Sequence, residues 1–225
     1  MSKKILMIVT SHNHINAERL TGIWFEEFAI PYAVFREHGY AITVASPKGG
    51  QAPIDPNSYP PENEREAFSE VLNRLATTEP ITAITSSKYD AVFLPGGHGT
   101  MFDLPMPEIG QIVGQFANAD KVIAAVCHGP AGLITARRAD GNAIVKGYQV
   151  TGFTNAEEDA ANLTTEMPFL LQDKLTELGA EFIATPLWND HVVVDRKLIT
   201  GQNPQSSKST AQAVIDLLER VATPA

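Results

Sequence analysis

The chain alternates short, fully apolar segments with longer segments of helical periodicity, and this pattern runs through residues 1–135. The unbroken apolar segments are typical of strands that are buried on both faces of a sheet. The helical pattern is clearest in residues 23–38, where Phe25, Phe28, Ala29 and Tyr32 fall on one face. Because parallel strands need crossover connections, this alternation predicts a parallel sheet with helices on both of its faces. The predicted strands are residues 5–10, 41–45, 91–94 and 122–126.

The rest of the sequence fits the same α/β class. Residues 191–194 and 198–200 flank a short polar turn and predict a small C-terminal hairpin, and residues 47–64 predict a long loop. We find no linker or internal repeat, so we expect one domain over residues 1–225, with a flavodoxin-like, doubly wound, mostly parallel sheet. Further helices are predicted at 65–77, 107–118, 131 onward, 167–178 and 206–222, and short strands at 149–152 and 181–185.

Charge and cysteine content exclude several classes of protein. The formal net charge is −9, which argues against a nucleic-acid partner or a polybasic membrane surface. The longest apolar runs are too short to span a membrane, and the N-terminal run lacks a small-residue cleavage site. A single cysteine, Cys127, rules out an internal disulfide or a multi-thiolate zinc site. We therefore expect a reduced, cytoplasmic setting, with no metal and no cofactor.

That cysteine lies at the junction between a predicted buried strand and a turn of small residues. The segment Val126-Cys127-His128-Gly129-Pro130 has the layout of a nucleophile elbow, with cysteine in place of serine. The carboxyl end of a parallel strand is where open α/β sheets bind ligands, and a following helix N-terminus favours the thiolate. We therefore expect a strained, exposed and reactive thiol. The alternative is an inert buried cysteine. The His-Gly-Pro sequence that follows disfavours this alternative, because polar and turn-forming residues are unusual at a junction that only packs.

Four segments together resemble the PfpI-like superfamily, which has the class I glutamine amidotransferase-like fold. They are residues 22–31 (GIWFEEFAIP), 94–101 (LPGGHGTM), 125–131 (AVCHGPA) and 201–206 (GQNPQS). The motifs HGTMFD and CHGPAG are most similar to those of the branch of heat-shock chaperones and glutathione-independent glyoxalases. This resemblance covers essentially the whole chain.

The resemblance implies specific partners for Cys127. In this family a buried glutamate lies four residues before a proline, which selects Glu27 through Pro31 and not the adjacent Glu26. Glu27 and Pro31 share a helix face beside the apolar stripe, although most helix glutamates are solvated. A carboxyl group in such surroundings has a raised pKa and can share a proton with the thiol.

His128 is the expected base, and a carboxylate has to orient its ring. The family's spacing after the Gly152-Phe153-Thr154 segment places Glu158 in this role. Glu157 is a close rival, Asp159 a weaker one, and a solvated helix start is the alternative for the whole acidic run.

The amides of Gly97 and His128 are expected to form an oxyanion hole. His98 either lines the pocket or caps the loop in which it lies, and we favour the second role. His12 and His14 form a His-X-His pair, but no third ligand has suitable spacing, so we expect no metal there.

The implied activity is that of a glutathione-independent glyoxalase, a lyase that converts methylglyoxal or a related small 2-oxoaldehyde to a 2-hydroxy acid. A stress-response holding chaperone or a protein deglycase is the alternative. A cysteine peptidase or amidase is less favoured, because no His-X-Glu motif follows residue 191. The resemblance also implies a homodimer.

Overall fold

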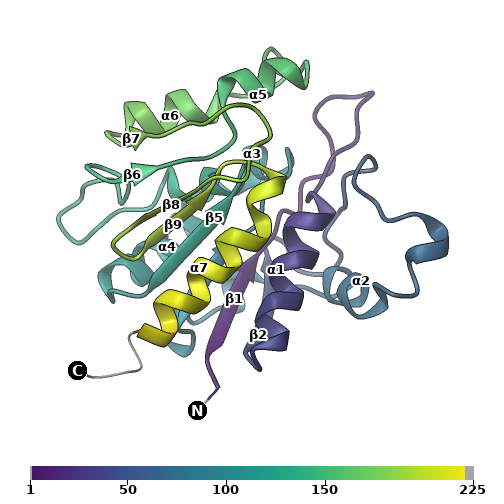
Figure 1. Ribbon diagram of the computed structural model, residues 1–225, viewed down its shortest axis with the longest axis horizontal. Helices are drawn as coiled ribbons and strands as arrows, with labels where there is room; N and C mark the ends of the chain where they lie inside the picture. The colour runs from purple at the N-terminus through teal and green to yellow at the C-terminus, as the bar shows by residue number, and fades with distance from the viewer. Residues whose placement is uncertain (1, 221–225) are drawn as a thin grey trace.

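The computed structural model describes residues 2–220 and contains a seven-stranded sheet in the order β3-β2-β1-β4-β5-β9-β8 (Figure 1). All neighbouring strands are parallel except β8 and β9, which are antiparallel. The strands are β1 (Lys4–Ile8), β2 (Ala41–Ser46), β3 (Glu79–Pro80), β4 (Ala91–Leu94), β5 (Val122–Val126), β8 (Val192–Asp195) and β9 (Leu198–Gly201). The predicted fold class is confirmed, and the C-terminal hairpin β8–β9 is part of the main sheet.

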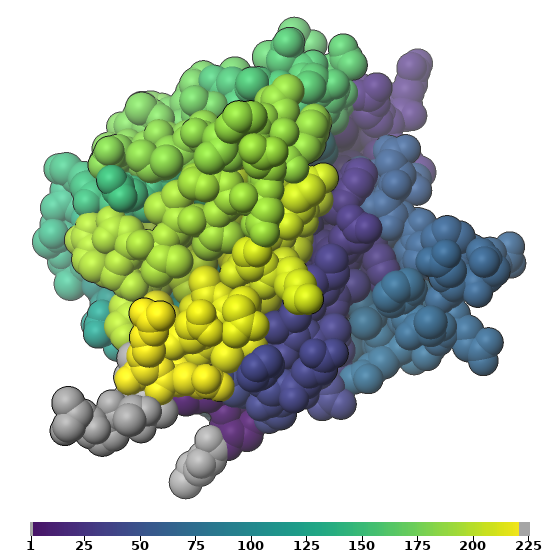
Figure 2. Space-filling view, viewed as in Figure 1, coloured from purple at the N-terminus to yellow at the C-terminus, as the bar shows by residue number. Residues whose placement is uncertain are grey.

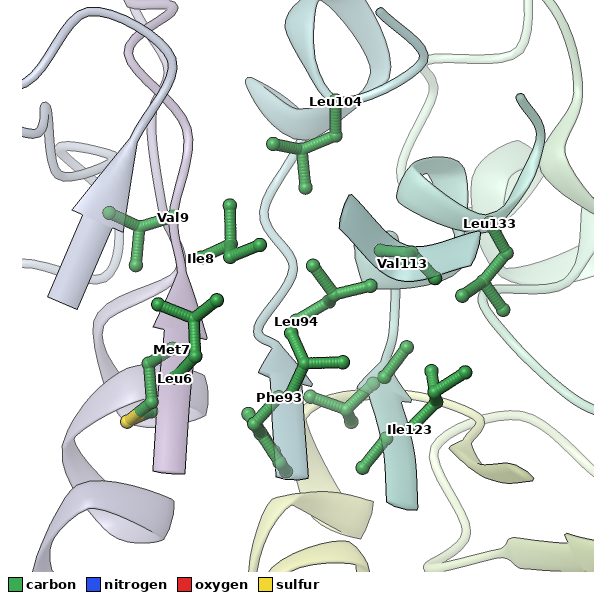
Figure 3. Packing of buried hydrophobic residues seen from close by; sticks show 14 of the residues in the cluster. Leu6, Met7, Ile8, Val9, Phe93, Leu94, Leu104, Val113, Ile123 and Leu133 are labelled. Atoms are coloured by element: carbon green, nitrogen blue, oxygen red, sulfur yellow. The ribbon is translucent and has the colours of Figure 1, made fainter. Parts of the chain in front are cut away.

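The three central strands β1, β4 and β5 are buried on both faces, as their unbroken apolar sequences predict. Their side chains form the core shown in Figure 3, where Leu6, Phe93 and Ile123 come from the three strands in turn. Val113 and Leu133 pack onto this core from segments that follow β4 and β5.

Helices cover both faces of the sheet. Helix α1 (Phe25–Glu37) packs side by side with the C-terminal helix α7 (Ser207–Arg220) on the near face, and α4 (Pro107–Asn118) lies behind the sheet (Figure 1). The space-filling view shows the purple α1 surface in direct contact with the yellow α7 surface (Figure 2). The remaining helices are α2 (Ser69–Ala76), α3 (Thr100–Asp103), α5 (Asn155–Ala160) and α6 (Leu171–Glu177).

A smaller layer lies against β8 and β9. It contains α5, α6 and a separate two-stranded parallel sheet of β6 (Gln149–Val150) and β7 (Glu181–Phe182) (Figure 1). Helix α5 begins with a capping box: the Thr154 hydroxyl accepts from the Glu157 amide while the Glu157 carboxylate accepts from the Thr154 amide. This cap fixes the start of the helix that carries the two candidate glutamates.

Several predicted boundaries were wrong. The helix expected at 65–77 begins at Ser69, after a 3-10 turn (Glu62–Glu64), and the helix expected at 167–178 begins at Leu171. The helix expected from Ala131 is a 3-10 helix (Gly129–Leu133), because Pro130 and the glycines disfavour a longer one. Residues 221–222 of the last predicted helix lie outside the described residues. No helix within residues 2–220 is long and apolar enough to cross a membrane.

Candidate active site

Cys127 occupies a sharp turn directly after β5. Its backbone φ is +57°, a left-handed conformation that costs a non-glycine residue about 1 kcal/mol or more. Gly129 and Gly96 make the turn possible, since a side chain at Gly129 would clash with the Leu94 carbonyl, and a Cβ on Gly96 would lie 2.6 Å from the His128 amide nitrogen. The strained turn is the one expected for a nucleophile elbow.

The Cys127 thiol is buried, with 3% of the residue exposed, where the sequence predicted an exposed thiolate. Burial raises the pKa of the thiol well above its ordinary value, and the neighbouring Glu27 raises it further. The amides of His128 and Gly97 point toward the sulfur and oppose this rise in pKa. The short 3-10 helix that follows adds little of the helix-dipole effect assumed from the sequence. The raised pKa of Cys127 favours the thiol over the thiolate in the free protein.

Glu27 projects from the first turn of α1 and is fully buried beside the thiol. Its Oε2 accepts a 2.8 Å hydrogen bond from the Gly96 amide, while Oε1 is buried without a hydrogen-bond partner among the described residues. Burial raises the pKa of Glu27 to about 8, although its contacts with Cys127 and the Gly96 amide oppose the rise. At neutral pH, therefore, Glu27 is largely protonated and holds a proton next to the thiol.

His128 lies between the thiol and Glu158. Its Nδ1 is 3.3 Å from Cys127 Sγ, and its Nε2 is 2.8 Å from Glu158 Oε2. Burial alone would raise the pKa of Glu158, but His128 and His98 hold it well below its ordinary value. An ionised Glu158 accepts the Nε2 proton of His128 and leaves the Nδ1 lone pair directed at the thiol. Burial and the nearby His98 lower the pKa of His128, so the ring is a neutral acceptor.

His98 is also a partner of Glu158, which corrects the expectation that it caps its own loop. His98 Nε2 lies 2.8 Å from Glu158 Oε1, and its ring centroid lies 4.2 Å from that of His128. Glu158 therefore bridges two histidines, one with each oxygen. No local feature of the sequence indicates this contact, because Glu158 lies 60 residues further along the chain.

Glu157 is fully buried and points away from the thiol. Its Oε1 accepts hydrogen bonds from the Trp188 amide (3.0 Å) and from the side-chain amides of Gln202 (3.1 Å) and Asn203 (2.8 Å). Its Oε2 accepts from the amide and hydroxyl of Thr154, both at 3.0 Å. The structure thus separates the two rival glutamates, because only Glu158 contacts His128.

A pocket of about 120 Å³ adjoins the thiol, and three large aromatic side chains form much of its wall. Trp24, Phe153 and Trp188 form its sides, and Cys127 and Glu27 also line it. Trp188 is 41% exposed and has a backbone φ of +62°, which its hydrogen bond to Glu157 helps to maintain. Nothing local in the sequence shows that these aromatic residues converge, because they come from three segments far apart in the chain.

The other histidines do not line this pocket. His12 stacks on Phe102 with ring centroids 4.6 Å apart, and His14 is exposed and bonds to Asn13. Within residues 2–220, the one His/Cys/Asp/Glu group close enough to hold a metal is His98, His128 and Glu158, with ligand atoms within 4.8 Å of one another. Those atoms are already joined by the hydrogen bonds described above. The absence of a metal stays a prediction.

Comparisons with known proteins agree with this arrangement. The glutathione-independent glyoxalase hsp3101 of Schizosaccharomyces pombe is 34% identical over 87% of this chain and 86% of its own length. The crystal structure of glyoxalase III from Candida albicans has a TM-score of 0.87 and 31% identity, covering 95% of this chain and 96% of that one. A solved structure described only as APC35852 has a TM-score of 0.92 and 47% identity over 98% and 99% of the two chains.

The family model for DJ-1/PfpI matches residues 20–217, which include all the residues around the pocket. The match therefore covers both the fold and the elbow. This chain belongs to the DJ-1/PfpI family.

Proposed function

We propose that the protein is a glutathione-independent glyoxalase that converts methylglyoxal, or a related small 2-oxoaldehyde, and water to the 2-hydroxy acid. The observation that carries this proposal is a thiol between a neutral histidine nitrogen and a protonated glutamate in a small pocket. Such a site supplies a nucleophile, a base and a proton carrier without any second thiol. The relatives named as glyoxalases support the assignment.

In the first step, Cys127 adds to the aldehyde carbon of the substrate. His128 Nδ1, 3.3 Å from the sulfur, takes the thiol proton as the carbon–sulfur bond forms. Ionised Glu158 stabilises the imidazolium that results. The former aldehyde oxygen takes the proton of Glu27, which yields a neutral hemithioacetal and a Glu27 carboxylate. The amides of Gly97 and His128 stabilise charge on that oxygen as it develops.

In the second step, the Glu27 carboxylate removes the hydrogen from the former aldehyde carbon. The electron pair forms the double bond of an enediol while the neighbouring carbonyl oxygen takes the proton from His128. Glu27 then returns its proton to that second carbon, and the hydroxyl on the sulfur-bearing carbon loses its proton to His128. The product of this step is a thioester. A pKa of about 8 suits Glu27 for this task, because an acid–base group works best near the operating pH.

In the third step, water attacks the thioester carbon while the Glu27 carboxylate takes one of its protons, which restores the protonated Glu27 of the free protein. The carbon–sulfur bond breaks, the 2-hydroxy acid leaves, and the thiolate recovers a proton from His128. The net reaction consumes one water and oxidises nothing external, so it needs no external oxidant or reductant.

The size of the pocket favours a small substrate over a polypeptide. A volume of about 120 Å³ between the indoles of Trp24 and Trp188 suits a three-carbon dicarbonyl. This geometry disfavours the peptidase alternative, which requires an extended chain at the nucleophile.

The direct test is the release of D-lactate from methylglyoxal by the wild-type protein and by Cys127→Ala. The proposal expects rapid release by the wild type and a rate equal to the protein-free background for the variant. Equal rates for the two proteins would contradict it. Suppression of client aggregation that is the same in both proteins would instead favour a chaperone. Release of free arginine from a preformed methylglyoxal adduct, in the presence of a scavenger of free aldehyde, would favour a deglycase.

We also propose a homodimer in the cytoplasm with a role in the response to dicarbonyl stress. Membership of the DJ-1/PfpI family supports these points. Sedimentation equilibrium tests the dimer, and fractionation of the source cells tests the compartment.

A further inference from the structure

A second cavity lies at the opposite end of the sheet from Cys127. It has a volume of about 350 Å³ and is lined by residues at the amino ends of β5 and β9, namely Lys121, Ile123, Lys197 and Leu198. This is within the range of about 300–1,000 Å³ that is usual for small-molecule sites. It is larger than the pocket around Cys127, and the reaction proposed above does not use it.

The wall of this cavity is strongly cationic, although the chain as a whole carries a net charge of −9. Lys121, Arg138, Arg196 and Lys197 line it, and Asp120 is the one acidic residue among them. Within residues 2–220, the ion pair between Arg196 and Asp195, at 2.9 Å, is the only one that any of these four cations makes. The cavity therefore has an excess of positive charge that the described part of the chain does not neutralise.

The cations are held in place by the fold. The Lys121 ammonium donates to three backbone carbonyls, including that of Ser86 at 3.2 Å. The guanidinium carbons of Arg138 and Arg196 lie 5.1 Å and 3.3 Å from the ring centroid of Tyr148, which also lines the cavity. These contacts reduce the conformational entropy that the side chains would lose when a ligand binds.

The turn that supplies two of the cations is unusual. Arg196 and Lys197 form the two-residue connection between β8 and β9, and Arg196 has a φ of +56°. Glycine or asparagine is favoured at such a position, and another residue there costs about 1 kcal/mol or more. The strained turn thus places two cations at this cavity, and strained backbone conformations of this kind are concentrated at functional sites of proteins.

We propose that this cavity binds a small molecule that carries phosphate groups. The donors without a hydrogen-bond acceptor among the described residues are Lys197 Nζ, Arg196 Nη1 and Arg138 Nε, since the other donors of the two arginines bond to backbone carbonyls or to Asp195. Several cations around one cavity match the charge of a phosphate better than that of a monocarboxylate. The acidic surface elsewhere and the concave shape disfavour a nucleic acid as the occupant.

The test is isothermal titration of the full-length protein with pyrophosphate, inorganic phosphate and lactate at low ionic strength. We expect pyrophosphate to bind with a dissociation constant of about 1 mM or lower, phosphate to bind more weakly, and lactate not to bind measurably. Lys197→Glu should weaken pyrophosphate binding by about tenfold or more, because it reverses a charge at the cavity.

The matched control is Lys208→Glu, which makes the same change of charge on the exposed side of α7. It should leave pyrophosphate binding within about twofold of the wild type. Glyoxalase activity and the melting temperature of Lys197→Glu show whether the variant is folded. Absence of pyrophosphate binding to the wild type, or an equal loss in both lysine variants, would overturn the proposal. Either result leaves the assignment of Cys127 unaffected.

Discussion

The two sides of Cys127 place equally buried glutamates in opposite charge states. On the α1 side, Glu27 is 0% exposed and has a pKa raised to about 8. On the α5 side, Glu158 is 2% exposed, and its pKa lies well below its ordinary value. Burial raises the pKa of both carboxyl groups, so the opposite outcomes come from the partners: the Cys127 thiol and the Gly96 amide for Glu27, and two histidines for Glu158.

This difference assigns the two acids to different tasks. A carboxyl group that is neutral near pH 7 can give up and recover a proton, whereas one that stays ionised can only orient and stabilise its neighbours. In the mechanism proposed here, Glu27 moves protons on the substrate and Glu158 supports His128. The contrast makes distinct predictions for changes on the two sides.

The largest effect is expected from Glu27→Gln. Glutamine can still accept the Gly96 hydrogen bond but cannot transfer a proton, so kcat/KM for methylglyoxal should fall by about a thousandfold or more. The pKa of Cys127 should fall as well, because the thiol titrates above the pKa of Glu27, where an ionised Glu27 opposes the thiolate. Steady-state D-lactate assays and the pH dependence of thiol alkylation measure the two effects.

Glu26→Gln is the matched control, since Glu26 is exposed one residue away. It should leave both the turnover rate and the alkylation profile at wild-type values. Equal losses in the two glutamine variants would show that the α1 side acts through fold stability and not through proton transfer.

The raised pKa of Glu27 also predicts how stability depends on pH. Between the unfolded pKa of 4.5 and the folded value of about 8, the folded protein holds a proton that the unfolded chain has released. Stability should therefore fall as pH rises through this window, by about 3 kcal/mol from pH 5 to pH 8. Chemical unfolding at both pH values should show this fall in the wild type and a smaller fall in Glu27→Gln. Identical slopes would contradict a neutral Glu27.

On the other side, Glu158→Gln should lower kcat by about a hundredfold. The amide of glutamine can accept from only one histidine, so His128 loses the partner that keeps its proton on Nε2.

Glu157→Gln should instead destabilise the fold by about 3 kcal/mol, because several buried donors lose their acceptor. Melting temperatures and kcat measured on both variants distinguish these outcomes, and a reversed pattern would exchange the two roles.

The smallest effect is expected at His98. His98→Ala removes one of the two donors to Glu158 and should lower kcat by about tenfold, with little change in KM. His98→Gln, which retains a side-chain N–H donor, should recover part of this loss. If both variants reduce activity equally through KM, His98 contacts the substrate and does not position Glu158.

The parts of the fold with strong local signals were predictable. The apolar run of β5 and the proline-started helix α4 have the boundaries that the sequence predicts, Val122–Val126 and Pro107–Asn118. Their periodicity and start signals lie within the segments themselves. The strained turn at Cys127 was predictable for the same reason, because its residues are consecutive in the chain.

What depends on distant contacts was not predictable. The exposed thiolate expected for Cys127 was wrong because Glu27, a hundred positions earlier in the chain, and the pocket wall bury the sulfur. The role expected for His98 was wrong because its partner, Glu158, is 60 residues away. Spacing pointed to Glu158 over Glu157, but the opposite directions of these adjacent side chains depend on the loops that surround α5.

The central claim is that Cys127 bonds covalently to the substrate while Glu27 moves its proton. The most direct measurement is 13C NMR of Glu27→Gln with methylglyoxal labelled at the aldehyde carbon, in which the blocked proton transfer leaves the first adduct in place. We predict a hemithioacetal carbon signal that is absent from the Cys127→Ala/Glu27→Gln double variant. Two results would contradict the account, provided that the wild type forms D-lactate. One is the absence of this signal from Glu27→Gln, and the other is the same signal in the double variant.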